Sequence, residues 1–420
     1  MRLTRRNLLR SAAMLGAASA FPSLARAESF LDMFARNQVL NNTNRAANTD
    51  AALDLLTTNE PILSVDTANN IQAAIAQYEP FVAAGGWKDV SRRVFNLILG
   101  NSGPGVVELK YRMMASGDMA PQQSPNDLFD GTLDKAVRVF QARHGLTVSG
   151  KVDEPTFYAM QVPAAVRLSQ LQLNLARVQN LVPTLTDSYV VANIPAAKVE
   201  IVEQGLVIQR HTAVVGRIDR PTPILNSKIN QINFNPYWHV PKSIIRKDLI
   251  PEMRRDPTYL AQFHIRVYDA KGNEVDPSVV DWTSDTDAVR YNFTQDPGSF
   301  NSEGHVKINF PSPENVYMHD TPEKELFEED ARFDSSGCMR VQDVDQVVAW
   351  LLQGNDGWDL ASVDAAMQGN VPKSVPVKKQ QPIHTTYITA WANRQGTVSF
   401  RDDVYQYDAQ GKTTFDAVNA

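Results

Sequence analysis

The sequence predicts an α+β protein in which a helical N-terminal part precedes a β-rich part. Through most of residues 61–186, apolar residues recur every three or four positions, which is the spacing of one helix face. From Tyr189 onward, short apolar runs are separated by turn-forming residues, which indicates strands. The chain of 420 residues is long enough for two or three domains.

The first 27 residues have the pattern of a signal peptide. Arg5 and Arg6 precede a weakly apolar stretch from Ser11 to Phe21, and Ala25-Arg26-Ala27 has the small residues that signal peptidase accepts. The arginine pair favours the twin-arginine export route, with ordinary secretion as the alternative. We therefore expect a mature protein that starts near Glu28, works in the periplasm and begins with a mobile leader over residues 28–60.

The charge balance argues against nucleic acid and anionic membrane surfaces as partners. The formal net charge is −6, and removal of residues 1–27 takes away five arginines and no acids, which gives −11. No later apolar run approaches the eighteen residues that a membrane span requires. We expect no stable membrane insertion after signal cleavage.

Residues 61–103 are predicted to form a helical scaffold. Asp66 or Thr67 is placed to cap a helix, and Gly85-Gly86 follows its expected end. The apolar face of this helix is expected to contain Ile71, Ala74, Ile75 and Tyr78.

Residues 104–162 are predicted to form a compact helical unit. A helix starts at Asp130 or Thr132 and ends at His144-Gly145, and Asp153 caps a second helix with Pro155 in its first turn. The apolar face of the first helix contains Leu133, Ala136, Val137 and Phe140. We expect His144 to be a packed or capping residue.

The remaining segments complete the predicted organisation. Residues 163–186 have the spacing of a linking helix, with Leu168, Leu171, Leu175 and Val178 on its core-facing stripe. Residues 187–370 form the β-rich domain, which begins with a hairpin turning at Glu203-Gln204-Gly205. Residues 235–302 are expected to be a lid or insertion without sheet elements, and residues 371–420 a C-terminal extension that packs on the scaffold or on the β-rich domain.

The only cysteine, Cys338, follows His319 by nineteen residues. A thiol needs a base or a positive neighbour to act as a nucleophile at neutral pH, and histidine is the usual partner. A lone cysteine forms no intramolecular disulfide and is too few for a thiolate zinc site. A buried, inert cysteine is the alternative interpretation.

The residues around Cys338 favour a reactive thiol over a buried, inert one. Tyr317 and His319 are two apart, so in a strand they point to the same side. Gly337 permits a sharp turn, and the N–H groups near Gly337 and Cys338 could donate to an oxyanion. Arg340 could hold a substrate carboxylate, or could pair with one of the local acids.

Two groups of residues resemble known families. Phe140-Gln141 and Gly150-Lys151-Val152-Asp153 resemble the small helical peptidoglycan-binding module of many wall enzymes, with a helical spacer as the alternative. Tyr317-Met318-His319-Asp320-Thr321-Pro322, followed by Ser335-Ser336-Gly337-Cys338-Met339-Arg340, is similar to the catalytic signature of L,D-transpeptidases. The match extends to Asn235-Pro236-Tyr237-Trp238, Gln295-Asp296-Pro297-Gly298 and Trp391, and resembles the large Gram-negative class with a capping insertion.

The resemblance implies a role for each matching residue. Cys338 is the nucleophile, His319 the base and Tyr317 a neighbour of the oxyanion, while Gly337 shapes the turn. The expected substrate-binding residues are Arg340, Ser335, Ser336, Trp238 and Tyr237. Ser336 stands where many members have a second histidine, so one histidine is expected to act.

The implied reaction is acyl transfer on peptidoglycan stem peptides. Cys338 would attack the bond between diaminopimelate and D-alanine, and the amine of a neighbouring stem would resolve the thioester to a 3–3 cross-link. Hydrolysis, exchange of a D-amino acid and attachment of a protein are close variants that the residues leave open.

Three other classes explain the sequence less well. A cysteine endopeptidase has the cysteine before the histidine, and a wall-binding scaffold leaves the His–Cys spacing unexplained. A zinc peptidase lacks a ligand cluster, since the other histidines are scattered singly, so no metal and no cofactor are expected. The expected partners are peptidoglycan stems and glycan, with other wall-synthesis enzymes as further candidates.

Overall fold

The computed structural model describes residues 58–369, 371–415 and 418–419. The expected signal peptide and almost all of the expected leader lie outside the described residues. The described chain divides into two compact units. One contains residues 77–168 and 328–331, and the other contains residues 58–76, 169–327 and those from 332 onward.

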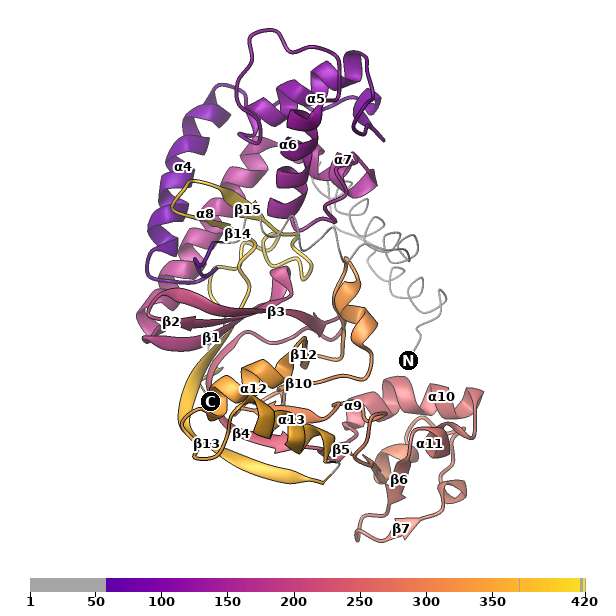
Figure 1. The fold of residues 1–420 in the computed structure, drawn as a ribbon. Coiled ribbons are helices and arrows are strands. Elements are labelled where there is room, and N and C mark those ends of the chain that lie inside the picture. The colour runs from indigo at the N-terminus through magenta and orange to yellow at the C-terminus, as the bar shows by residue number, and fades with distance from the viewer. Residues whose placement is uncertain (1–57, 370, 416–417, 420) are drawn as a thin grey trace. The chain divides into compact units, whose positions relative to one another are not determined.

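Three helices, labelled in Figure 1, form most of the first unit: α5 (Pro104–Ala115), α6 (Gly131–Arg143) and α7 (Glu154–Gln161). The Asp130 carboxylate accepts a hydrogen bond from Leu133 N–H at the start of α6, and Asp153 caps α7 in the same way, so both predicted caps are confirmed. The core of this unit joins all three helices and also includes Val90 and Val94. Its packing therefore begins upstream of the helical unit expected from residue 104.

His144 is buried at the end of α6, as predicted for a packed or capping residue. Its ring stacks on Phe140 with 4.0 Å between centroids, and its Nδ1 hydrogen-bonds to the Phe140 carbonyl. Gly145 follows with a φ of 69°, the left-handed conformation that glycine supplies at helix ends.

Two longer helices have residues in both units. Helix α4 (Thr67–Ala83) buries Ile71, Ala74 and Ile75 as predicted. Helix α8 (Ala164–Leu181) buries Leu171 and Val178 of the predicted stripe, whereas Leu168 and Leu175 are half-buried.

The second unit is built on one large sheet. Its strands are β1 (Ser188–Asn193), β2 (Lys198–Glu203), β3 (Leu206–Gly216), β4 (Leu225–Phe234), β9 (Val306–Asn309), β10 (Met318–His319), β11 (Phe333–Ser335), β12 (Met339–Val341), β13 (Lys373–Thr386) and β16 (Val418–Asn419). The order is β11-β3-β12-β10-β9-β4-β13-β1-β2, with β16 paired to β4, and β2 also pairs with β3. Strand pairing therefore closes into a circuit. The β2–β3 hairpin turns through Gln204 and Gly205, both at positive φ, as the sequence predicts.

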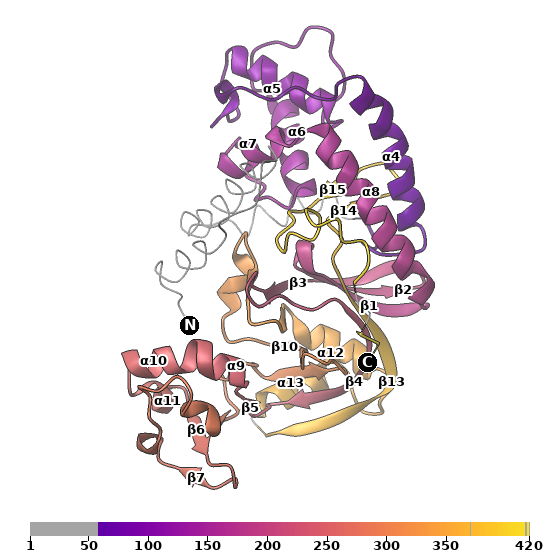
Figure 2. The ribbon, with the colours of Figure 1, turned by 180° about the vertical axis from the view of Figure 1, so that it is seen from behind.

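Strand β13 corrects the predicted domain boundary at residue 370. It pairs antiparallel with β4 and parallel with β1, so it is an interior strand of the sheet and not part of a peripheral extension. Figures 1 and 2 show it running along β4. Its pattern is hard to recognise because Pro376 and Pro382 interrupt it, and its register shifts between Pro376 and Gln381.

Helices α12 (Val344–Leu352) and α13 (Leu360–Gln368) follow the cysteine segment. The predicted apolar face of α12, comprising Val344, Val347, Val348 and Leu351, is buried. After α13 the chain enters β13, and Trp358 between the two helices stacks on Phe234 of β4 at 5.0 Å.

The segment 235–302 is an insertion, as predicted, but the expectation that it holds no sheet elements is wrong. Its strands β5 (Trp238–His239), β6 (Ile265–Tyr268), β7 (Glu274–Val275) and β8 (Asn292–Gln295) form a separate sheet in the order β5-β8-β6-β7. Its helical segments are α9 (Lys242–Ile244), a π-helical turn (Ile245–Leu249), α10 (Ile250–Arg255) and α11 (Tyr259–Gln262), which lie beside that sheet in Figure 2. Strands of two to four residues are too short to give a recognisable alternation.

The insertion has its own apolar core, formed by residues such as Ile245, Leu249, Val267 and Phe293. Trp238 and Trp282 pack against this core and are partly buried. Both tryptophans therefore belong to the core of the insertion, including Trp238, which the resemblance places among the substrate-binding residues.

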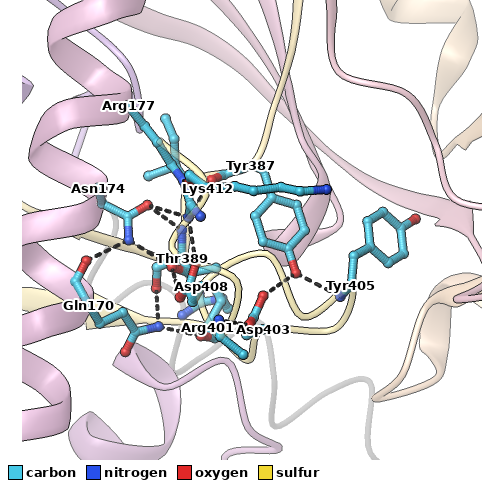
Figure 3. Close-up of polar contacts among 12 residues, drawn as sticks. Gln170, Asn174, Arg177, Tyr387, Thr389, Arg401, Asp403, Tyr405, Asp408 and Lys412 are labelled. Atoms are coloured by element: carbon cyan, nitrogen blue, oxygen red, sulfur yellow. Dashed lines mark hydrogen bonds and ion pairs between the residues drawn. The ribbon is translucent and has the colours of Figure 1, made fainter. Parts of the chain in front are cut away.

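The C-terminal segment, which includes β14 (Ala390–Ala392) and β15 (Val398–Phe400), is bound to α8 by a polar network. Figure 3 shows Asn174 exchanging hydrogen bonds with Thr389, and Arg177 paired with Asp408 at 2.5 Å. Gln170 donates to the Arg401 carbonyl. These side chains form a buried polar stripe on α8 that the apolar spacing does not predict.

Within the described residues, none of the helices combines the length and the apolar character needed to cross a membrane.

Candidate active site

Five chemically important side chains share one face of the large sheet. In the antiparallel pair β9–β10, Lys307 lies opposite His319, and in the parallel pair β10–β12, His319 lies opposite Arg340. Tyr317 precedes His319 by two residues and Cys338 precedes Arg340 by two. Because alternate residues point to the same side of a strand, Lys307, Tyr317, His319, Cys338 and Arg340 lie together.

The turn that presents Cys338 is held by Ser335. The Ser335 hydroxyl donates to the Cys338 carbonyl at 2.5 Å and accepts from Gly337 N–H at 3.1 Å. Gly337 has a φ of 113°, which confirms the sharp turn predicted there. Its N–H is thus already engaged, and among the described residues the Cys338 N–H has no hydrogen-bond acceptor. Ser335 itself is buried within the turn.

Thr222 and Tyr405 support the same turn from the other side. The Thr222 hydroxyl donates to the Gly337 carbonyl at 2.9 Å, and Thr222 N–H donates to the Tyr405 hydroxyl at 3.1 Å. The Tyr405 hydroxyl in turn donates to the Gly216 carbonyl. Figure 3 shows the backbone of Tyr405 bound to the Tyr387 hydroxyl, so the C-terminal network reaches the cysteine turn.

The thiol of Cys338 is neutral at physiological pH. Burial raises the pKa of Cys338 to about 11; hydrogen bonds with Tyr317 act in the opposite direction, and the Glu303 carboxylate raises the pKa further. Burial raises the pKa of the neighbouring Asp334 carboxyl, and the nearby Arg340 and Arg217 act in the opposite direction.

His319 is also neutral, and its orientation is fixed. Its Nδ1 donates to the backbone carbonyl of Asp320, which leaves Nε2 as the free acceptor. Burial and the nearby Arg340 lower the pKa of His319 to about 3. Among the described residues no hydrogen bond joins His319 to Cys338; the thiol's hydrogen-bonding neighbour is Tyr317.

Glu303 and Lys307 belong to the site although neither is among the residues predicted from the sequence. The Glu303 carboxylate pairs with Lys307 Nζ at 3.0 Å, and this ammonium lies 3.6 Å from the centre of the Tyr317 ring. Burial raises the pKa of the Glu303 carboxyl. The signal was present, because Lys307 and Asn309 alternate with the buried Val306 and Ile308 and so mark a polar face on β9.

The remaining predicted residues have identified neighbours. Arg340 donates to Glu323 at 2.7 Å, which is the ion-pair alternative that the sequence left open. Ser336 is exposed and accepts from Arg220, which also pairs with Asp248 in the insertion. Tyr237 is 49% exposed, whereas Trp238 is partly buried against the core of the insertion.

The fold and the site define a β-rich domain whose cysteine, histidine and tyrosine share a sheet face, in a chain that also has a small helical unit. Residues 187–365 match the family described as the L,D-transpeptidase catalytic domain, and residues 102–160 match the putative peptidoglycan binding domain. Both matches fall on the segments that carry the two resemblances in the sequence, and they agree with those resemblances.

A relative from Haemophilus influenzae, named "Putative L,D-transpeptidase", is 34% identical over 218 residues. The match covers 52% of this chain and 44% of the relative, so this chain spans less than half of that protein's length.

Solved L,D-transpeptidases are more distant. The enzyme from Mycobacterium smegmatis is 14% identical, with a TM-score of 0.23 over 48% of this chain and 58% of that one. The one from Xylanimonas cellulosilytica is 13% identical, with a TM-score of 0.23 over 69% and 97%. At scores this low, these likenesses support no conclusion about the site.

Proposed function

We propose that this protein is a periplasmic L,D-transpeptidase that uses Cys338 to form 3–3 cross-links between peptidoglycan stems. The observation that supports this most is the shared face of Tyr317, His319 and Cys338 within the matched catalytic domain. The matched module and the signal-like N-terminus agree with a wall enzyme that is exported. The twin-arginine route is part of the same proposal.

The first half of the reaction forms a thioester. Because the thiol and the imidazole both start neutral, His319 Nε2 takes the Cys338 proton as the sulfur attacks the carbonyl of diaminopimelate. The developing oxyanion accepts hydrogen bonds from the Tyr317 hydroxyl and the Cys338 N–H, since Gly337 N–H is engaged by Ser335. The C–N bond then breaks, and D-alanine leaves with the proton held by His319.

The second half transfers the acyl group. A neutral amine of another stem attacks the thioester carbonyl and gives its proton to His319, and the C–S bond breaks. The proton then passes to the Cys338 sulfur, which restores the neutral pair. Water in place of the amine would give carboxypeptidase activity by the same path.

A carbapenem tests the nucleophile, because its strained carbonyl presents the same kind of electrophile. Incubation should add one drug mass to the protein, located on the peptide that contains Cys338 and absent from Cys338→Ala. With tetrapeptide-rich sacculi, the wild-type protein should produce 3–3 cross-linked muropeptides. Binding to sacculi with neither an adduct nor a product would favour the inert cysteine and a wall-binding scaffold.

A further inference from the structure

The catalytic face continues across the sheet as a row of polar side chains. In register from β13 to β12, the row consists of Ser374, Asn233, Lys307, His319 and Arg340. Neighbouring strands are roughly 4.8 Å apart, so Asn233 on β4 lies about 10 Å from His319 on β10. The row therefore extends from the proposed base to a second position within reach of a bound amino acid.

Several buried polar atoms on this face have no hydrogen-bond partner among the described residues. They are Asn233 Oδ1, Asn309 Nδ2, Arg340 Nε and Glu303 Oε2. Asn309 follows Lys307 by two positions and shares its face. Glu303 pairs with Lys307 through its other oxygen, and its carboxylate also interacts with the Tyr317 hydroxyl. Buried polar groups are normally paired, so several unpaired ones on one face indicate a surface that a ligand completes.

A cavity of about 270 Å³ opens beside this row, and its lining includes Asn233, Tyr237, His239 and Lys307. Glu303 lies within electrostatic reach of both His239 and Cys338. Lys307 thus lines the cavity, and its partner Glu303 lies near both the cavity residue His239 and the thiol.

The polar atoms around Lys307 differ in their chemistry. Glu303 Oε2 and Asn233 Oδ1 are acceptors that suit an ammonium group, whereas Lys307 Nζ and Asn309 Nδ2 are donors that suit a carboxylate. A single carbon that carries both an ammonium and a carboxylate would satisfy both sets. The far end of a diaminopimelate side chain has this arrangement, and so does a free amino acid.

We propose that Glu303, Lys307, Asn233 and Asn309 form the subsite that binds the incoming amine through its zwitterionic carbon. This inference rests on the proposed transpeptidase function and specifies its acceptor. The ammonium releases one proton to solvent before attack. The amine then forms the C–N bond as the C–S bond breaks, and its second proton passes through His319 to Cys338.

The test measures how the acyl-enzyme partitions between amine and water, a ratio that does not depend on the acylation rate. A tetrapeptide donor is supplied with D-methionine, with D-methioninamide, which lacks the carboxylate, or with a diaminopimelate-containing tripeptide. The wild-type enzyme should favour D-methionine over its amide by at least about tenfold. Lys307→Met should remove this preference by lowering transfer to D-methionine, and Lys307→Arg should retain it.

Asn233→Ala and Glu303→Gln should lower transfer to both D-methionine and its amide, because both acceptors carry the ammonium. Lys378→Met is the matched control: Lys378 is an exposed lysine on the same sheet, paired with Asp356, and its loss should leave every ratio unchanged. If the tripeptide saturates transfer at far lower concentration than D-methionine, the natural acceptor is a second stem. If D-methionine saturates transfer at far lower concentration than the tripeptide, the natural reaction is amino-acid exchange.

Two negative results have different meanings. If the wild-type protein forms no acyl-enzyme, the proposed function itself fails. If the acyl-enzyme forms, but the preference for D-methionine is absent or survives Lys307→Met, only the subsite is overturned. Should Lys307→Met fail to fold, Asn233→Ala decides by another measurement: transfer to both acceptors, relative to hydrolysis, that equals the wild-type value would overturn the subsite.

Discussion

His319 and Cys338 are both neutral over most of the pH scale, because burial moves their pKa values in opposite directions. The pKa of His319 is lowered to about 3 and that of Cys338 is raised to about 11. At pH 7 the resting site therefore holds a thiol and an imidazole, not a thiolate–imidazolium pair. The thiolate forms only as His319 accepts the proton during attack.

This charge state predicts how Cys338 reacts with a simple electrophile. The rate of alkylation by iodoacetamide should rise about tenfold per pH unit from pH 7 to 10, since the thiolate fraction grows in that proportion below the pKa. Acylation of Cys338 by the donor stem should persist in acid until the pH approaches the His319 pKa of about 3, because only there does the imidazole become protonated. Alkylation that is already maximal at pH 7 would contradict the neutral pair.

The histidine can be separated from the thiol by substitution. His319→Ala should lower turnover at pH 7 by at least about a hundredfold, as expected for loss of a general base. Residual activity should increase with pH, since solvent then generates the thiolate without a base. A defect of equal size at every pH would mean that His319 has a structural role.

At the scale of elements, the cysteine turn depends on a loop and on the C-terminal segment. Thr222 joins the Gly337 carbonyl to the Tyr405 hydroxyl, and all of these groups are buried. The position of the thiol is thus set in part by residues more than sixty positions away in sequence.

Thr222→Val retains the shape of the side chain but removes the hydroxyl. Leaving the Gly337 carbonyl unpaired should cost about 1–3 kcal/mol in the free energy of unfolding. It should also lower kcat about tenfold or more with KM little changed, because the turn loses its orientation. Tyr407→Phe is the control: its ring contacts Tyr405 and Tyr387, but no hydrogen bond joins it to the described cysteine turn. An equal loss of kcat in both variants would assign the effect to general packing.

The insertion is joined to the cysteine segment through Arg220, which donates to Ser336 at 2.8 Å and pairs with Asp248. If the insertion covers the bound substrate and excludes water, Asp248→Asn should shift products from cross-links to hydrolysed tripeptides. Asp296→Asn breaks a more exposed pair in the same insertion, with Arg266, and should have a smaller effect. If the ratio of cross-links to hydrolysed tripeptides is the same in both variants and in the wild type, the hypothesis that the insertion covers the substrate has no support.

At the scale of the whole molecule, the helical module is expected to concentrate the enzyme on its substrate. Its core includes Val90 and Val94, so a clean deletion should remove about residues 88–162 and not begin at 104. The variant should bind sacculi more weakly but react normally with soluble stem peptides. Acylation by a carbapenem serves as the control that the β-rich domain remains folded. If the deletion left binding to sacculi unchanged, the module would be only a spacer.

Local signals predicted much of this architecture. Helix starts at Asp130 and Asp153 follow from side chains that cap the nearest turn, and the hairpin at Gln204 follows from a two-residue loop. The sequence does not predict strand β13 or the sheet of the insertion, because their stability comes from partners far away in sequence. In β13, Pro376 and Pro382 interrupt the alternation of apolar and polar residues that indicates a strand. In the insertion, strands of two residues are too short to show that alternation.

In the active site, too, local patterns predict some residues, and contacts between distant segments determine the others. The placement of Tyr317, His319 and Cys338 could be predicted from their spacing and motif. The alternation on β9 marks Lys307 as part of a polar face, but its place opposite His319 depends on strand register. Glu303 and Thr222 could not be predicted, because their roles arise from contacts with residues distant in sequence. The Arg340 ion pair with Glu323 likewise depends on tertiary contact.

The interior position of β13 has a consequence for biogenesis. Until residue 386 leaves the ribosome, β1 and β4 expose unpaired edges to solvent, and such edges promote aggregation. The large sheet therefore cannot be completed before residues 373–386 have been synthesised. A ribosome that stalls before this strand releases a chain that quality control should degrade.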